Sequence, residues 1–227
     1  MTRTELISRF REENPELTSR VFADSVLNSW LIAGNLEIAC KARLIKGDTS
    51  FSSVAGTRSY DLTTQITNFY DIDDFPGGGV VYDNDPLELT SISELDTRRS
   101  SWRTEANGTP KKFWRWNQYL YLDKKPVSVK TIEVYSILFP GDFDTASETP
   151  FNELTHLEPF HYSLVLYMQK RAKAAVGKPE EAQAAEAEYG KYVTWMKNEV
   201  NRGIYSAIQF TPALGYIGGR ATRRSRA

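Results

Sequence analysis

The stretch TSFSSVAGTRSYDL, residues 49–62, marks the point where the sequence changes from helical to β-type patterning. Serine, threonine and aromatic residues fill both of its halves, and threonine and aromatic residues are common in strands. Gly56-Thr57 lies between the halves, and glycine is a frequent turn former. We therefore expect a β-hairpin over this stretch, with helical parts of the chain before and after the β-type part that it opens.

Short strand-like runs separated by turn formers continue downstream of this stretch. The run KKFWRWNQYLYLDKKP, residues 111–126, predicts a hairpin that turns near Asn117-Gln118. The run VKTIEVYSIL, residues 129–138, alternates apolar and polar residues as a half-buried strand does. We expect residues 47–149 to form one antiparallel, β-rich domain.

Apolar residues recur at helical spacing upstream, over residues 2–14 and again over residues 18–44. Thr2 and Glu5 have the spacing of a capping box, which marks the start of the first helix. Gly34-Asn35 is expected to interrupt the second helix. The N-terminal part is therefore mostly helical.

The helical period returns over residues 157–172, and Gly177 and Pro179 then mark the end of one helix and the start of another. This pattern predicts an αα-hairpin whose second helix stops near Gly203. Helices at both ends of the chain must bury their apolar faces, and the simplest arrangement packs them together. We expect an α+β fold in which residues 1–46 and 150–203 form a helical bundle that carries the β-domain as an insertion.

The C-terminal segment, residues 204–227, combines apolar residues with Gly and Pro and shows neither a helical nor an alternating period. It is expected to be an extended tail that either lies on its own body or binds a partner. The four arginines in its last eight residues leave a net charge of −5 on residues 1–219, since the whole chain carries −1. The candidate binding residues of this tail are Ile204, Tyr205, Ile208, Phe210, Pro212, Leu214, Tyr216, Ile217, Arg220, Arg223, Arg224 and Arg226.

Composition argues against several classes of site. The single cysteine, Cys40, allows no intrachain disulfide and no cysteine-based zinc site, and we expect it to be a small buried residue. His156 and His161 are five residues apart, about 140° around a helix, so they would not share a face as a metal pair. Gly77-Gly78-Gly79 lacks the residues of a phosphate-binding loop, and Asp142 starts no complete calcium loop. We expect no metal, no cofactor and no catalytic residue.

The N-terminus has no secretory signal, and no apolar run approaches the roughly 18 residues of a membrane-spanning helix. A protein made and kept in a cytoplasm, with no membrane contact, is expected.

Two alternatives remain open on the residues alone. Any two of the carboxylates would serve a hydrolase that cleaves cell-wall sugars, should they meet in space. The aromatic residues of the 111–126 hairpin would also serve as a platform for sugar rings or nucleic-acid bases. Their alternate spacing favours β-core and cross-strand pairs over a platform. The carboxylates are Asp71, Asp73, Asp74, Asp96, Glu153 and Glu158, and the aromatic residues are Trp114, Trp116, Tyr119 and Tyr121.

Ordered motifs within this helix–β–helix layout carry a family resemblance. Residues 49–62 resemble the TT-x-AGT-x-x-Y-x-L segment of tailed-phage head–tail adaptor proteins. Gly108-Thr109-Pro110, then Trp114 and LYLDKKP at 120–126, are similar to the GTP…(Y/W)…L-x-L-x-P-x-P hairpin of that family. The chain has Lys-Lys-Pro in place of Pro-x-Pro, and Thr63 where a proline is usual. The likeness covers residues 4–200.

The resemblance implies a structural protein of the virion neck, assembled in the host cytoplasm and without enzymatic activity. Such a protein would form a dodecameric homo-oligomeric ring that docks on the portal protein and connects it to a tail, nozzle or other neck protein. DNA would pass through the ring without sequence recognition. The family's C-terminal tail reaches the portal, which implies that role for residues 204–227.

Overall fold

The first helix, α1 (Arg3–Glu13), begins at the capping box that the sequence indicates. The Thr2 side chain accepts a hydrogen bond from the Glu5 backbone at 3.3 Å, and the Glu5 carboxylate accepts one from the Thr2 backbone at 2.7 Å. These two bonds satisfy donors that a helix start would otherwise leave unpaired.

The computed structural model describes residues 1–73, 79–98 and 101–218, with side chains up to Val200 except those of Glu153 and Thr155.

The second helix, α2 (Asp24–Ala42), runs without a break through Gly34-Asn35, so the expected interruption there is wrong. Gly34 lies against α5 (Tyr162–Ala175), where an added Cβ would be 2.8 Å from the Cδ1 atom of Tyr167. The Asn35 side chain accepts a hydrogen bond from the backbone N–H of Phe151 at 3.0 Å. Both residues are therefore packing residues of a continuous helix.

The C-terminal helices form the expected αα-hairpin of α5 and α6 (Pro179–Gly218), joined through Gly177 in the left-handed region at φ +75°. Two short 3₁₀ helices, η1 (Phe151–Glu153) and η2 (Thr155–Phe160), precede them. The helical period that starts at residue 157 therefore begins as a 3₁₀ turn, with Pro159 inside it.

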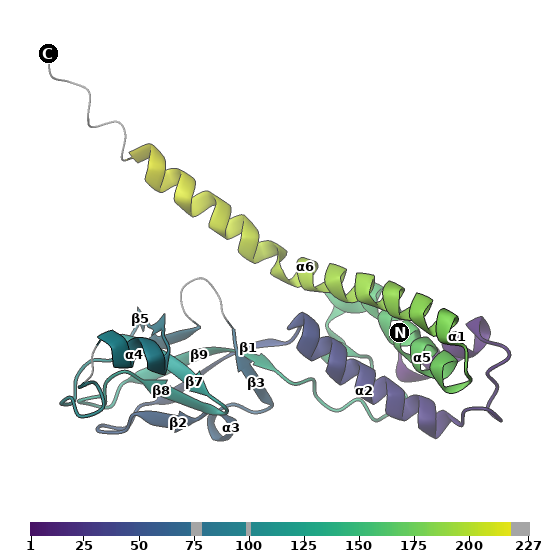
Figure 1. Cartoon of the computed structure of the whole chain (residues 1–227), viewed down its shortest axis with the longest axis horizontal. Helices are drawn as coiled ribbons and strands as arrows, with labels where there is room; N and C mark the ends of the chain where they lie inside the picture. Colours follow the sequence, from purple (N-terminus) through teal and green to yellow (C-terminus); the bar gives the residue numbers. More distant parts are fainter. Residues whose placement is uncertain (74–78, 99–100, 219–227) are drawn as a thin grey trace, which may run out of the picture.

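Helix α6 continues to Gly218, so the expected stop near Gly203 and the extended backbone after it are wrong for residues 204–218. A single glycine costs a helix only about 1 kcal/mol, so Gly203 alone does not require the helix to end. Residues 219–227, with the four arginines, lie outside the described residues. Figure 1 shows α6 as one long rod that extends beyond the other helices.

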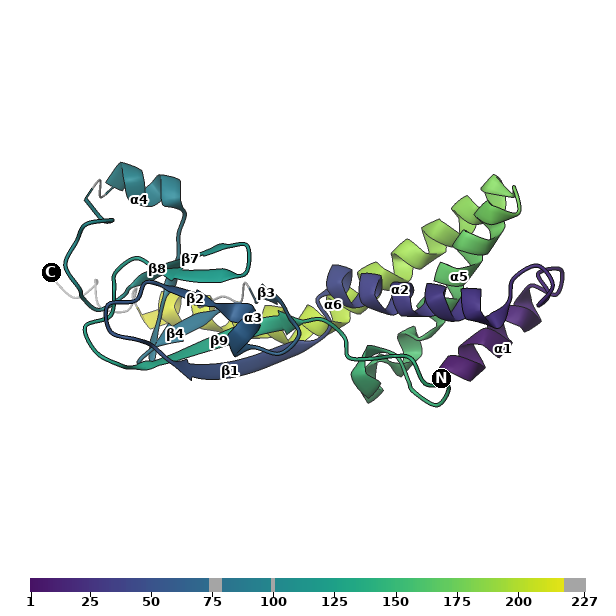
Figure 2. The same cartoon turned by 90° about the horizontal axis from the view of Figure 1, so that it is seen from below.

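One hydrophobic core joins the first and last helices, because apolar residues of α1, α2, α5 and α6 pack in a single cluster. The other elements form two sheets with their own core, which contains Leu62, Phe69, Ile132 and Val134 among others. Helices and largely antiparallel sheets together give the expected α+β class. Figures 1 and 2 show the helical region and the β-region end to end.

The two sheets divide the stretch that opened the sequence analysis. The first contains β1 (Lys46–Ser52), β9 (Thr131–Leu138), β4 (Val80–Tyr82), β5 (Asp85–Pro86) and β3 (Phe69–Ile72). The second contains β2 (Ser59–Asp61), β8 (Tyr119–Leu122), β7 (Lys112–Trp116) and β6 (Glu88–Leu89). Two short helices, α3 (Leu62–Gln65) and α4 (Ile92–Arg98), complete the β-region.

The expected hairpin over residues 49–62 is wrong, because β1 pairs with β9 and β2 pairs with β8 in the other sheet. The turn between them does use Gly56, at φ +77°. The Tyr60 hydroxyl closes it, donating to the Thr57 carbonyl at 3.1 Å and accepting from the Val54 N–H at 3.1 Å. The expected turn is thus present, but the strands on either side of it, β1 and β2, pair with strands of different sheets.

The hairpin expected near Asn117 is confirmed, with β7 and β8 paired antiparallel and Asn117 at φ +53°. The strand expected at 129–138 is β9, the central strand of its sheet, with β1 along one edge and β3 and β4 in tandem along the other. One pairing departs from the antiparallel expectation, since β6 and β7 are parallel.

Candidate interaction surfaces

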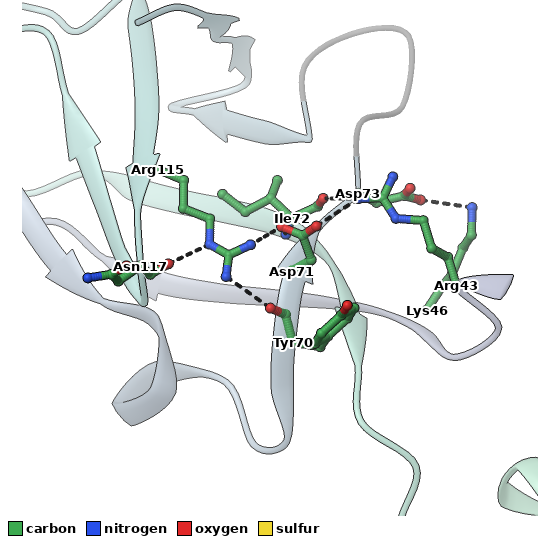
Figure 3. Close-up of polar contacts among 8 residues, drawn as sticks. All are labelled: Arg43, Lys46, Tyr70, Asp71, Ile72, Asp73, Arg115 and Asn117. Carbon is green, nitrogen blue, oxygen red and sulfur yellow. Dashed lines mark hydrogen bonds and ion pairs between the residues drawn. The ribbon is translucent and has the colours of Figure 1, made fainter. Parts of the chain in front are cut away.

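A network of charged side chains joins the helical region to both sheets (Figure 3). At its centre is Asp71 of β3, which accepts hydrogen bonds from Arg43 at 2.8 Å and from Arg115 of β7. Arg43 follows the last residue of α2 and adopts the left-handed conformation, at φ 54°. Asp71 therefore links the end of α2, one sheet and the other sheet through a single carboxylate.

The network extends to backbone groups and to a second ion pair. Arg115 also donates to the carbonyls of Tyr70 at 3.0 Å and Asn117 at 2.5 Å, and the Nζ atom of Lys46 lies 2.9 Å from an Asp73 carboxylate oxygen. The Asp71, Arg43 and Arg115 side chains are each about two-thirds or more buried. Half-buried, multiply bonded pairs hold geometry better than exposed pairs do. This network connects the end of α2 to both sheets of the β-region.

An aromatic hollow of about 410 Å³ lies on the outer face of the second sheet. Trp114 stacks on its cross-strand partner Tyr121, with ring centroids 5.3 Å apart and planes at 8°, and Trp102 meets Trp114 edge-on at 5.1 Å. The guanidinium groups of Arg58 and Arg103 each lie within 5 Å of the Trp102 ring centre, a cation–π geometry. The hollow is a preformed aromatic surface with two cations at its rim.

Some aromatic residues of the β7–β8 hairpin pack in cross-strand pairs, and others are exposed as a stacking platform would be. Trp114 is buried and forms a cross-strand pair, as favoured from the sequence. Trp116 is 57% exposed and lines the hollow, and Tyr119 is 37% exposed beside it.

The candidate tail residues from Ile204 to Ile217 lie on the last part of α6, and their side chains are outside the described residues. Arg220, Arg223, Arg224 and Arg226 are outside the described chain altogether. The sequence between Gly203 and Gly219 contains no charged residue. The candidate binding segment is therefore, for most of its length, an uncharged helical arm.

The carboxylates considered for a hydrolase do not converge where the structure describes them. Asp71 and Asp73 belong to the charged network, and Asp96 is paired with Arg103 beside the aromatic hollow. Glu158 is exposed on η2, Asp74 lies outside the described residues, and the Glu153 side chain is not described. Within the described ranges, no three His, Cys, Asp or Glu side chains gather as a metal-binding group.

The two histidines lie in different environments. His156 is exposed, whereas His161 is buried. The Nδ1 atom of His161 lies 2.9 Å from the Met1 ammonium, and Nε2 is buried without a hydrogen-bond partner. Burial, and next the nearby ammonium, lower the pKa of His161 to about 4. His161 is therefore a neutral core residue at pH 7.

Two of these features had no clear signal in the sequence. The Asp71 network brings together residues far apart in the chain, and only the fold makes them neighbours. Trp102 and Arg58 of the hollow come from segments on either side of the hairpin. Of the residues of the hollow, only the aromatic residues of the β7–β8 hairpin could be singled out from the sequence, by their alternate spacing.

An uncharged projecting helical segment and an exposed aromatic hollow are features of a protein that works through contacts with other macromolecules. The sequence profile of the family described as SU10 adaptor protein matches residues 1–208. The chain therefore belongs to the SU10 adaptor family, a family of phage head–tail adaptors, and is a structural component of the virion. None of the curated proteins matches the chain.

Membership implies interaction with portal and tail proteins in general. Among the described residues, no helix combines the length and apolar character needed to cross a bilayer.

Proposed function

We propose that this protein is the ring subunit that docks on the portal, carries the tail and lines the DNA exit channel, without catalysing a reaction. The observation that carries the proposal is the C-terminal arm, residues 204–218 of α6. At 1.5 Å per residue the arm is about 23 Å long. It extends beyond the helical region and has no charged residue.

An uncharged, apolar helix is poorly solvated, and burying its side chains in a groove of a partner protein is favourable in free energy. The arginines that follow it, from Arg220 to Arg226, would meet an acidic portal surface or the DNA nearby. We infer that the arm is the portal-docking element, and that residues 1–46 and 150–203 act as one frame that carries residues 47–149 as an insertion. The shared core of α1, α2, α5 and α6 supports this division.

A chain that ends at Gly203 tests the docking role. It should keep its folded core, because the described core ends with residues before this point. Mixed with the cognate portal and imaged by electron microscopy, the full chain should form a ring on the portal. The shortened chain should form none. Deletion of residues 219–227 alone is the matched control, and it separates the contribution of the arginines from that of the helix. Portal binding unchanged by the longer deletion would refute the docking role.

The aromatic hollow favours a second candidate function, the binding of a sugar ring or a nucleic-acid base. DNA binding that weakens with salt and disappears with Arg220, Arg223, Arg224 and Arg226 would belong to the arm. Binding that disappears instead in Trp116→Ala would belong to the hollow. A hydrolase role is tested by zymography on peptidoglycan, where we expect no cleared zone.

A further inference from the structure

The aromatic hollow opens on the outer side of the β-region. It is lined mainly by residues of β7, β8 and the segment that starts with α4, and Figure 2 shows α4 on the side of the second sheet that faces away from β1 and β9. Trp114 and Trp102 are only 5% and 4% exposed, whereas Trp116 at the same hollow is 57% exposed. Among the described residues, no other aromatic ring packs against Trp116. Trp116 therefore presents an uncovered indole ring beside a fixed aromatic wall.

Polar groups surround these rings with hydrogen-bonding capacity left over. In the described part of the chain, no group bonds to the Trp116 indole N–H or to the Tyr119 and Tyr121 hydroxyls. The Nη2 atom of Arg58 donates to the Trp102 carbonyl at 2.9 Å, and its Nε atom is buried with no hydrogen-bond partner among the same residues. An apolar surface edged by hydrogen-bonding groups suits a ligand that is apolar on one face and polar at its edges.

Carboxylates balance the two arginines at the rim. Both Nη atoms of Arg103 donate to the Asp96 carboxylate, one of them at 2.9 Å. Asp123 and Glu105 lie close enough to Arg58 to attract its charge. The three carboxylates outnumber the two arginines, so these groups give the hollow no net positive charge.

This charge balance fits a neutral ligand better than a nucleic acid. Proteins that bind a phosphate backbone draw much of their affinity from lysine and arginine side chains that neutralise the phosphates, and single strands are held in positively charged grooves. The hollow has a volume of about 410 Å³, within the range of roughly 300 to 1,000 Å³ that small-molecule sites occupy. A compact, uncharged ring is therefore the ligand that both its size and its charge favour.

We propose that the aromatic hollow binds a neutral pyranose unit of a glycan, with Trp116 stacked on one face of the sugar ring. The C–H groups of a pyranose form an apolar face that packs on an indole, and its hydroxyls surround that face. The Tyr121 hydroxyl and the Arg103 guanidinium lie at the rim to bond these hydroxyls. A guanidinium has five N–H donors, and Asp96 accepts only two of those of Arg103.

The inference rests on the second candidate function of the hollow and narrows its ligand from a sugar ring or a base to a neutral sugar. Because the charges at the rim are already paired, the affinity should come from stacking and from hydrogen bonds to hydroxyls. Such binding should depend little on salt, which is the property that separates it from the binding of nucleic acid.

Affinity electrophoresis of the full chain tests the class of ligand. The probes are dextran, mannan and galactan as neutral glycans, and single-stranded oligo-dT as the anionic comparison. We expect at least one of the neutral glycans to retard the chain, with a Kd that changes less than about twofold between roughly 50 and 200 mM salt. Binding to oligo-dT through the hollow would instead weaken steeply over the same range.

A substitution at the exposed ring assigns the binding to the hollow. Trp116→Ala should weaken the glycan complex roughly tenfold or more, because it removes the stacking surface. Trp116→Phe, which keeps a smaller ring, should retain part of the affinity. Trp195→Ala is the matched control, since Trp195 is also 54% exposed but lies on α6 outside the hollow, and it should bind the glycan as the native chain does.

Three results would overturn the inference. The first is that none of the three neutral glycans retards the chain. The second is that oligo-dT binds in a way that depends on Trp116 and the neutral glycans do not, which would make the hollow a base-binding site. The third is equal glycan binding by Trp116→Ala and Trp195→Ala, with both variants folded by circular dichroism, because the sugar would then bind elsewhere.

Portal binding is measured separately, so that this inference and the docking role can fail independently. Trp116→Ala should bind the cognate portal as the native chain does. Loss of portal binding in this variant, together with no glycan binding by the native chain, would assign the hollow to a partner protein and refute the sugar site. A native chain that binds a glycan through Trp116 but does not bind the portal would refute the docking role and support the sugar site.

Discussion

At the scale of single residues, Gly34 is tightly packed in its helix, whereas Gly190 has open space around it. In Gly34→Ala the added Cβ would be 2.8 Å from Tyr167 Cδ1 and 3.0 Å from Leu164 Cδ2, and the ring is held in the core. Overpacking should outweigh the helix gain of about 1 kcal/mol and destabilise the chain by roughly 1 to 2 kcal/mol. Urea unfolding measures this difference.

Gly190→Ala is the matched control, because it makes the same change where no atom lies within 4 Å. We expect it to stabilise the chain by about 0.5 to 1 kcal/mol. Equal effects of the two substitutions would show that Gly34 is not a close-packing position.

His161 should make stability depend on pH. Its pKa is about 4 in the folded chain and about 6.5 when unfolded, so only the unfolded chain takes up the proton between these values. The free energy of unfolding should be unaffected by this group above pH 6.5 and fall as the pH drops towards 4, by at most about 3 kcal/mol. Urea titrations at pH 7.5 and pH 5 measure the loss.

The variant His161→Gln cannot take up a proton and isolates this contribution from that of the carboxylates. Its stability should change less between the two pH values than that of the native chain. An identical change in both proteins would show that His161 is not the group responsible.

At the scale of elements, Asp71 should be the residue that ties β3 to the end of α2 and to β7. Asp71→Asn leaves the Arg43 and Arg115 guanidinium groups beside a neutral amide, so the charge-assisted bonds weaken. We expect a loss of about 1 to 2 kcal/mol in unfolding free energy and faster amide exchange over residues 69–72.

Asp83→Asn is the comparison, since the Asp83–Lys130 pair is nearly half exposed on both sides and should matter little. If the two variants behaved alike, the network would have no special role in joining the regions.

Elements with local signals were predictable from the sequence, and those that depend on distant partners were not. The capping box of α1, the β7–β8 turn and the α5–α6 junction are each set by residues a few positions apart. The strands on either side of Gly56 depend on β8 and β9, which lie more than fifty residues away, so their assignment to different sheets is not visible locally.

The candidate site shows the same division. The uncharged C-terminal segment could be singled out by composition, but its helical backbone could not, because interspersed glycine and proline obscured the period. The exposed side of α2, where Ile32 and Leu36 lie, was hidden in the sequence, since a helix that is apolar all round looks the same whether one of its sides is buried or exposed.

At the scale of the whole molecule, the arm should act as a rigid continuation of α6. Gly203→Pro removes a backbone donor and breaks the helix, at a cost of about 3 kcal/mol, whereas Gly203→Ala favours it. We expect the proline variant to lose portal binding and the alanine variant to keep it, measured by co-sedimentation with the cognate portal. Equal binding of both would mean that the arm docks without helical continuity.

The β-region leaves and rejoins the helical region at adjacent points, because the Leu138 N–H donates to the Ile45 carbonyl at 2.8 Å. Its two ends are therefore as close as neighbouring strands in a sheet. Two crossovers between viral genomes, at the codons for these residues, would exchange the whole region and leave the helical frame intact. Recombination among related viruses should therefore diversify residues 46–138 as one cassette, while the helices keep the constraints of their shared core.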